Sequence, residues 1–537
     1  MLGVKPFLLP LLLGSVLAAE PAKERWIYLP ANFQVDAKAD EVAGLITRAG
    51  KAGYTHALVA DSKFSRLATV MPNYAPNVAK VKAAAKEAKM EIVPALFPVG
   101  YSNDALFHDP NLAEGLPVRD AKFVVKGGSA EIVADPPVSL PGGQMNDRSG
   151  WGFIDDNLVV EDGAMRSGPT EGNARMQQLL KVSPFRQYHV SMRIRTAGFG
   201  GGQAEIKAIG KNGRQLQWSY LKVQPDQGWT QHDVTFNSLD SEEVGIYFGV
   251  WGRHRGTLWW DDAKIEECGP VNLLRRPGAP LVVKLEGGRE LVEQHDFAKL
   301  EDPGMGTKPW AGEFTPWHEA PILQIKNLKD GDVLRVSYYH THVIHDGQVC
   351  GCVEEPAFRE ILRDQAGRVP QLWETKIHMM SHDEWRVLGW DASCLKSGLG
   401  PGGIVAKNAR FCVDLLKEKV PAGRILVWND MFDPHHNAVK DYYLVNGSLE
   451  GAWEGLEPKV QIMNWNFGKR EESLAFFQKR GHEQVIAGFY DEPLQNVSAW
   501  IDSGEKVEGV KGFMYTTWRS DYSKLEEVAE ILRKRGW

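Results

Sequence analysis

The sequence predicts an α/β protein built on a (β/α)8 TIM barrel that is interrupted after its third strand by two all-β inserts. At both ends of the chain, apolar strand-like runs alternate with helical periodicity, which is typical of parallel βα units. In the middle, this alternation gives way to short alternating runs separated by Gly and Pro turns, which are typical of antiparallel sheets. The barrel is therefore expected in two parts with the inserts between them.

The first barrel part is assigned to residues 20–122. Residues 25–30, 55–61 and 91–97 are predicted strands, and the stretches between them carry apolar side chains at helical spacing. Strand, helix, strand, helix, strand at this period indicates parallel strands.

The inserts follow. Residues 123–270 are predicted to form an antiparallel sandwich, and its closing run, residues 256–265, resembles the last strand of jelly-roll carbohydrate-binding modules. Residues 271–340 form a second, small β insert. Its last strand, residues 333–339, follows the turn Lys329-Asp330-Gly331 and is placed in an antiparallel hairpin, outside the barrel.

The second barrel part is assigned to residues 341–537. Five apolar runs there, separated by helical patterns or a Gly-rich loop, bring the number of parallel strands to eight. Barrel chemistry is located at the carboxyl ends of the strands. These five ends read His382-Asp383-Glu384, Trp428-Asn429-Asp430, Asn464-Trp465-Asn466, Tyr490-Asp491-Glu492 and Trp518-Arg519-Ser520-Asp521. Aromatic side chains and carboxylates on one rim predict a sugar-binding pocket.

The run from Lys376 to Glu384 has two interpretations on its own. It is either a buried strand that delivers Asp383 and Glu384 to the rim, or a strand followed by a helix with Asp383 as its N-cap. Paired carboxylates are the usual groups that cleave a glycosidic bond. Neighbours in a regular strand point to opposite faces, so both carboxylates reach one sugar only if the strand breaks at His382.

Over about residues 353–518 the sequence resembles family 20 glycoside hydrolases and the related β-N-acetylhexosaminidases. The resemblance lies in the order of five motifs: Asp-Glu, Trp-x-Asp, a strand ending in Trp, Tyr-Asp and Thr-Trp. The resemblance implies substrate-assisted retention, in which the 2-acetamido oxygen attacks the anomeric carbon. It implies that Glu384 is the general acid/base and that Asp383 orients the acetamido group. The implied binding residues are Trp428, Trp465 and Trp518 as pocket walls, Tyr490 as donor to the acetamido oxygen, and Asp491 on sugar hydroxyls.

Asp430 is also expected in the binding site, and His382 either contacts a hydroxyl, holds Glu384 or is structural. Ser381-His382 and Ser520 depart from the family pattern, so the choice between GlcNAc and GalNAc stays open. Two alternatives remain. A retaining glycosidase with Asp430, Asp491 or Glu492 as nucleophile would act on sugars without a 2-acetamido group. A barrel without activity would make the chain a glycan-binding protein.

Composition and the N-terminus complete the prediction. The 537 residues are 43% hydrophobic and 24% charged, with a formal net charge of −7, which argues against nucleic acid or an anionic membrane as the main partner. The expected partner, an oligosaccharide or glycoconjugate, follows from the strand ends instead. Residues 1–19 have the layout of a secretory signal peptide, so the protein is expected to be exported, periplasmic or extracellular. The five cysteines match no zinc spacing, and no metal or cofactor is expected.

Overall fold

The computed structural model describes residues 23–345 and 347–537, so the expected signal peptide lies outside the described residues. Eight parallel strands close into a barrel, in which the last strand pairs with the first through Trp26 and Met514. In spatial order, the strands are β1 (Glu24–Pro30), β2 (His56–Ala60), β3 (Glu91–Leu96), β17 (Ile377–Met380), β19 (Arg424–Trp428), β21 (Gln461–Asn464), β22 (Gln484–Phe489) and β23 (Val510–Thr516).

The barrel interior is a packed core. Alternate residues of the strands point inward, because successive side chains in a strand face opposite sides. One connected cluster of buried apolar side chains fills this space and includes Leu58, Val93, Met379, Leu426 and Met463. The cluster ends at the carboxyl rim with Trp428 and Trp465, where it meets the cavity described below.

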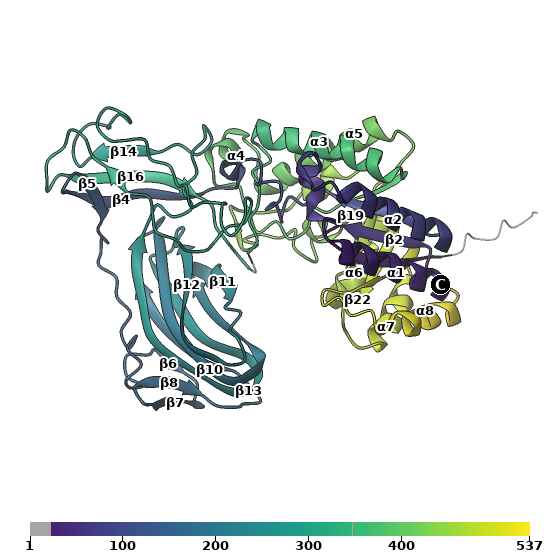
Figure 1. Cartoon of the computed structure of the whole chain (residues 1–537), viewed down its shortest axis with the longest axis horizontal. Helices are drawn as coiled ribbons and strands as arrows, with labels where there is room; N and C mark the ends of the chain where they lie inside the picture. The colour runs from purple at the N-terminus through teal and green to yellow at the C-terminus, as the bar shows by residue number, and fades with distance from the viewer. Residues whose placement is uncertain (1–22, 346) are drawn as a thin grey trace, which may run out of the picture.

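Helices cover the outside of the barrel. Their bounds are α1 (Asp36–Ala52), α2 (Tyr74–Ala88), α3 (Pro356–Trp373), α5 (Pro401–Lys419), α6 (Arg470–Lys479), α7 (Gln495–Gly504) and α8 (Leu525–Lys534). The short helix α4 (Ala392–Lys396) lies beside the root of the inserts rather than on the barrel wall (Figure 1).

The prediction of an α/β (β/α)8 TIM barrel is wrong. Within the described residues, no α-helix connects β19 to β21; that connection holds the 3-10 turns η4 (Asp430–Phe432) and η5 (Ala452–Gly455) and the two-residue strand β20 (Leu444–Val445). The segment contains Pro434, Gly447 and Gly451, which interrupt helical spacing. In addition, most strand residues belong to sheets outside the barrel.

A large antiparallel sheet follows the first barrel part. Its strands are β6 (Phe153–Ile154), β7 (Leu158–Glu161), β8 (Ala164–Ser167), β9 (Ala174–Lys181), β10 (Gln187–Ile209), β11 (Gln215–Tyr220), β12 (Gln227–Asn237) and β13 (Glu243–Cys268). The long strands β10 and β13 pair along their length, but the register shifts between Ala197 and Gln203. Before the shift β10 also pairs with β12, and after it with β11, so the partner strand of β10 changes there.

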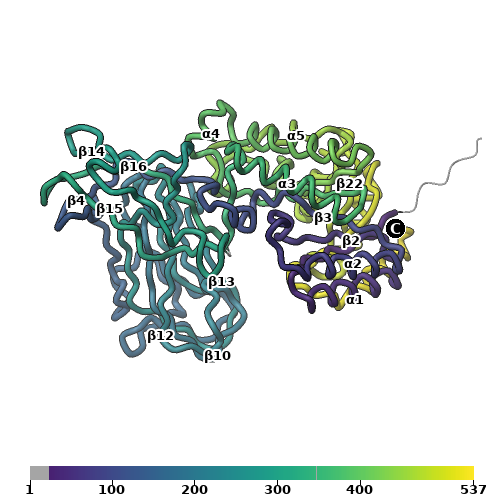
Figure 2. Tube along the Cα trace, turned by 45° about the horizontal axis from the view of Figure 1, so that its top comes forward, coloured from purple at the N-terminus to yellow at the C-terminus, as the bar shows by residue number. Residues whose placement is uncertain are grey.

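A second sheet of five strands lies beside the first (Figures 1 and 2). It comprises β14 (Val282–Leu285), β16 (Val333–His340), β4 (Leu116–Lys126), β5 (Ser129–Ile132) and β15 (Leu323–Gln324), in that order. Strand β16 is antiparallel to both β14 and β4, so it lies outside the barrel as predicted. The predicted hairpin is wrong, because β15, the strand before the turn at Lys329-Asp330-Gly331, pairs with β5 and not with β16. The range 123–270 assigned to the sandwich begins inside β4, a strand of this smaller sheet.

A membrane-spanning segment is not found among the helices of the described residues, since none of them is both long and apolar enough.

Candidate active site

A cavity of about 610 Å³ opens at the carboxyl ends of the barrel strands. Five aromatic side chains form much of its wall: Tyr28, Trp428, Trp465, Tyr490 and Trp518. Aromatic faces bind the apolar C–H faces of sugar rings. The size and lining of the cavity therefore suit a small ring-shaped ligand. A flat or extended protein surface would enclose such a ligand less well.

The aromatic side chains support one another. Trp465 stacks on Tyr490 with ring centroids 5.5 Å apart, and Trp518 meets Tyr490 edge-on at 5.2 Å. Tyr28 meets Trp518 edge-on at 5.3 Å. Trp518 is 50% exposed, which leaves its outer face open to a ligand. The wall is thus a connected aromatic cage contributed by β1, β19 and the segments that follow β21, β22 and β23.

Asp383 and Glu384 both line the cavity, because the strand that carries them breaks. Strand β17 ends at Met380, and the backbone φ angles of His382 and Glu384 are +52° and +46°. These left-handed conformations are uncommon for residues other than Gly and interrupt the strand's alternation. The strand therefore breaks at His382, as both carboxylates require in order to reach one sugar. The interpretation of Asp383 as the N-cap of a helix is wrong, since the next described helix begins at Ala392.

Glu384 is held by two neighbours. Its Oε1 pairs with Arg386 Nη2 at 2.8 Å, and the Tyr101 hydroxyl donates a hydrogen bond to its other carboxylate oxygen. Arg386 in turn donates to Gln348 at 2.5 Å and to the Tyr101 hydroxyl at 3.1 Å. These contacts restrict the Glu384 carboxylate to one orientation at the edge of the cavity.

Asp383 lies in an acidic environment. The surrounding protein displaces water from this partly exposed carboxyl, and the nearby charges of Asp430 and Glu384 repel its own, so the pKa of Asp383 lies well above its usual range. Burial also raises the pKa of Asp430. A proton shared among closely spaced carboxylates is a common feature of acid/base sites.

Asp430 and His382 lie behind the cavity rather than in its wall. Asp430 is fully buried, and its Oδ2 accepts hydrogen bonds from the Glu384 backbone N–H at 2.8 Å and from Asn437 at 3.0 Å. His382 is also buried, and its Nε2 lies 2.9 Å from Asn408 Oδ1. Burial lowers the pKa of His382 to about 4, so its ring is neutral near pH 7. Both residues hold the broken strand end.

Asp491 holds the loop that presents Trp518. It accepts hydrogen bonds from the Thr517 hydroxyl at 2.5 Å and from the backbone N–H groups of Trp518 and Arg519 at 2.8 and 3.2 Å. It is absent from the cavity lining, whereas Tyr490, one residue earlier, is part of it. Phe489, Tyr490 and Asp491 all have positive φ angles, and this turn at the end of β22 places the Tyr490 ring in the wall.

The Tyr490 hydroxyl is a buried donor. Its oxygen is inaccessible to solvent and has no hydrogen-bond partner among the described residues. Burial and the nearby carboxylates raise the pKa of this phenol, so it keeps its proton. A buried donor without a partner is costly unless a ligand satisfies it.

Sequence reasoning missed several cavity residues, among them Tyr28, Tyr101 and His345. The position of Tyr28 in the cavity could have been predicted, because this residue lies near the carboxyl end of the first predicted strand. Tyr101 and His345 lie in loops whose course the local pattern does not determine. The ring of His345 packs 4.8 Å from that of Trp218 in β11, so the large sheet contacts the cavity wall.

No protein-family model matches the chain. No match was found among curated proteins. Solved structures similar to it include a rhamnosidase from Novosphingobium sp. PP1Y, with 11% identity, a TM-score of 0.30, and coverage of 96% of this chain and 59% of that one. An exo-beta-agarase has 8% identity and a TM-score of 0.25, covering 72% of this chain and 98% of the agarase.

A carbohydrate-binding module from Cellvibrio mixtus lichenase 5A, in complex with cellotriose, has 12% identity and a TM-score of 0.18. That match covers 24% of this chain and 97% of the module. The similar structures thus include glycoside hydrolases and carbohydrate-binding modules. Their TM-scores are too low to carry an argument about fold or activity, which therefore rests on the cavity itself.

Proposed function

We propose that the chain is a glycoside hydrolase that cleaves β-linked N-acetylhexosaminides, of GlcNAc or GalNAc, by substrate-assisted retaining catalysis. The observation that carries the proposal is the meeting of Asp383, Glu384 and the unpartnered Tyr490 hydroxyl at one aromatic cavity. Carboxylates alone would fit many glycosidases. A buried donor beside them fits a substrate that brings its own acceptor, such as an acetamido oxygen.

The reaction has two steps. In the first, the acetamido oxygen attacks the anomeric carbon while the glycosidic bond breaks, and Glu384 gives its proton to the leaving oxygen. Asp383 accepts a hydrogen bond from the acetamido N–H and stabilises the positive charge that develops on the oxazolinium ring. In the second, Glu384 takes a proton from water, whose oxygen attacks the anomeric carbon and reopens the ring with retention.

The alternative with a carboxylate nucleophile is less well supported. The three candidates, Asp430, Asp491 and Glu492, are all absent from the cavity lining. Asp430 is fully buried behind Glu384, and Asp491 accepts three hydrogen bonds from the Trp518 loop. Neither is free to reach an anomeric carbon without rearrangement. A glycan-binding protein without activity would not require two carboxylates in the cavity.

A panel of nitrophenyl glycosides, tested on wild type and Tyr490→Phe, examines the proposal. Wild type should hydrolyse β-N-acetylhexosaminides in preference to the matching glycosides without the acetamido group. Tyr490→Phe removes one donor and should lose about 1–3 kcal/mol of transition-state stabilisation on the acetamido substrates only. Tyr54→Phe, a buried tyrosine remote from the cavity, is the control. Preference for a sugar without an acetamido group would refute the proposal.

We further propose that the protein is exported and that the large antiparallel sheet binds carbohydrate, as its closing strand, residues 256–265, implies. Cell fractionation, followed by detection of the full-length chain, tests export. Binding of the intact protein to a glycan array tests whether the sheet binds carbohydrate.

A further inference from the structure

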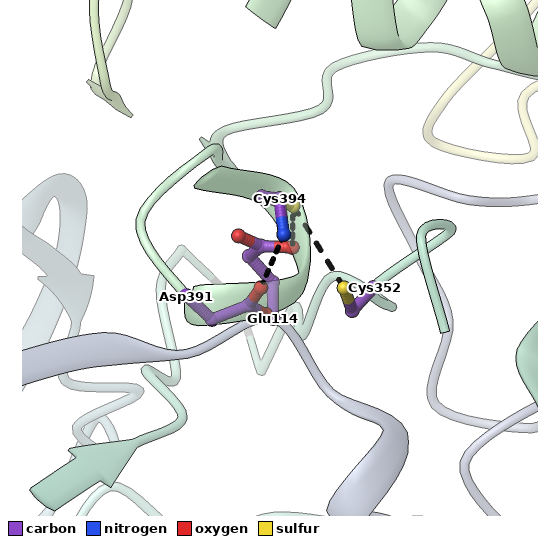
Figure 3. A group of neighbouring side chains, drawn as sticks. All are labelled: Glu114, Cys352, Asp391 and Cys394. Atoms are coloured by element: carbon purple, nitrogen blue, oxygen red, sulfur yellow. Dashed lines mark hydrogen bonds between the residues drawn. The ribbon is translucent and has the colours of Figure 1, made fainter. Parts of the chain in front are cut away.

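Four buried side chains converge at the root of the inserts, away from the cavity. They are Glu114, Cys352, Asp391 and Cys394, and none is more than 1% exposed. Figure 3 shows them pointing toward one another. One potential ligand atom from each lies within 4.8 Å of the others. The proposed glycosidase reaction uses none of them.

The distances within this cluster match those around a tetrahedral zinc ion. With Zn–S bonds of about 2.3 Å and Zn–O bonds of about 2.0 Å, tetrahedral angles place two sulfurs about 3.8 Å apart and a sulfur and an oxygen about 3.5 Å apart. The sulfurs of Cys352 and Cys394 are 3.8 Å apart. The sulfur of Cys394 lies 3.4 Å from Glu114 Oε2. Two thiols and a carboxylate are thus already spaced as ligands of one ion.

The surrounding contacts fix the ligands in place. The segments carrying Glu114 and Cys352 are joined by two backbone hydrogen bonds of 2.8 Å. Asp391 caps α4, because its Oδ1 accepts from the Cys394 backbone N–H at 2.9 Å. Arg276 donates to Asp391 Oδ2 at 2.6 Å, and Glu114 Oε1 accepts from the Gly389 backbone N–H at 2.9 Å. Hydrogen bonds of this kind orient metal ligands in proteins.

We propose that Glu114, Cys352, Asp391 and Cys394 form a structural zinc site. Cysteine thiolates and carboxylates both bind zinc, and a closed, four-coordinate arrangement is typical of zinc that stabilises a fold. With zinc bound, two thiolates and two carboxylates would carry four negative charges, which the ion and the Arg276 guanidinium on Asp391 would largely compensate. The ion would tie together the chain entering the inserts, the chain leaving them and the segment that follows Glu384.

Metal analysis of the full-length chain tests the site. Protein produced with zinc in the medium should contain a single zinc ion per chain by native mass spectrometry and elemental analysis. Protein stripped with a chelator should gain thermal stability when zinc is restored. Cobalt added to the stripped wild type should produce a thiolate-to-cobalt absorption band, which reports sulfur ligands without requiring any variant to fold.

The double variant Cys352→Ser with Cys394→Ser should lose the zinc and the cobalt band. Cys268→Ser, which changes a buried free cysteine outside the cluster, should keep both. Two outcomes would overturn the proposal. One is a disulfide between Cys352 and Cys394, seen as a mass lower by two hydrogens and a cross-linked peptide. The other is free thiols that bind neither zinc nor cobalt.

Discussion

At the scale of single residues, the proposal depends most on Glu384. Replacing it by Gln removes the proton that the leaving oxygen needs, so turnover should fall by about 10²–10⁴-fold. The loss should be larger for unactivated oligosaccharides than for nitrophenyl glycosides, whose leaving groups need little protonation. Steady-state rates on both substrate types measure this difference. Nearly wild-type hydrolysis of oligosaccharides by Glu384→Gln would remove Glu384 from the mechanism.

Protonation of Asp383 should control how activity falls at acidic pH. The pKa of Asp383 is raised by the displacement of water from its carboxyl and by the nearby charge of Asp430, and its ionised form is the one that stabilises the oxazolinium. As the pH falls through this raised pKa, kcat/KM should fall, at a pH well above the ordinary Asp value of about 3.9. Asp430→Asn removes a repelling charge, so the pKa of Asp383 should decrease and the acid limb should move to lower pH.

The profile of kcat/KM against pH for wild type and Asp430→Asn measures this shift. Asp502→Asn, at an exposed site on α7, is the matched control and should leave the profile unchanged. An acid limb that stays in place in Asp430→Asn would show that Asp383 does not control it.

At the scale of elements, the broken end of β17 is the critical feature. Gly100 packs against it so closely that an added Cβ would lie 2.1 Å from the Asp383 carbonyl oxygen. Gly100→Ala should therefore displace the segment that carries both carboxylates, with a loss of about 1–3 kcal/mol in unfolding free energy and a lower kcat.

Gly44→Ala is the matched control, because its Cβ would meet no atom within 4 Å on the exposed face of α1. It should stabilise the protein by about 0.5–1 kcal/mol and leave kcat unchanged. Chemical unfolding curves and steady-state rates measure both variants. Wild-type kcat in Gly100→Ala would show that the position of the β17 end is not limiting.

The same element shows what the sequence can predict. Apolar runs located the eight barrel strands, and the opposed directions of neighbouring strand residues required a break at His382, because these are local properties of the chain. After β19 the sequence predicts a Gly-rich loop, which includes Gly447 and Gly451, and the described residues form no α-helix there, so the eight parallel strands are not accompanied by eight βα helices. Local patterns also assigned Asp430 to substrate, whereas tertiary packing buries it behind Glu384.

In the whole molecule, the features that the sequence did not predict are contacts between segments that lie far apart along the chain. Glu114 and Cys394 lie 280 positions apart yet come within 3.4 Å, so no ligand spacing along the chain identifies the proposed zinc site. Likewise, Trp218 of the large sheet packs against His345 of the cavity wall. The inserts are therefore part of the surroundings of the active site.

Trp218→Ala should weaken this contact. An aromatic contact of about 0.5–1.5 kcal/mol corresponds to about a twofold to tenfold increase in KM for oligosaccharides. The kcat on a nitrophenyl monosaccharide should stay near wild type, because Trp218 does not line the cavity itself. Trp229→Ala, in β12 of the same sheet and stacked under Arg195, is the control. Equal kinetic effects of the two variants would argue against a link between Trp218 and the cavity.

In the proposed mechanism the nucleophile is the acetamido oxygen of the substrate. Nitrophenyl N-acylhexosaminides in which the acetyl methyl carries none, one, two or three fluorines measure it directly, because each fluorine withdraws electrons from that oxygen. With this oxygen as nucleophile, kcat/KM should fall steeply along the series, because the oxygen donates electron density to the anomeric carbon in the transition state. Rates that are the same across the series, together with a 2-fluoro sugar covalently attached to Asp430, Asp491 or Glu492, would contradict it.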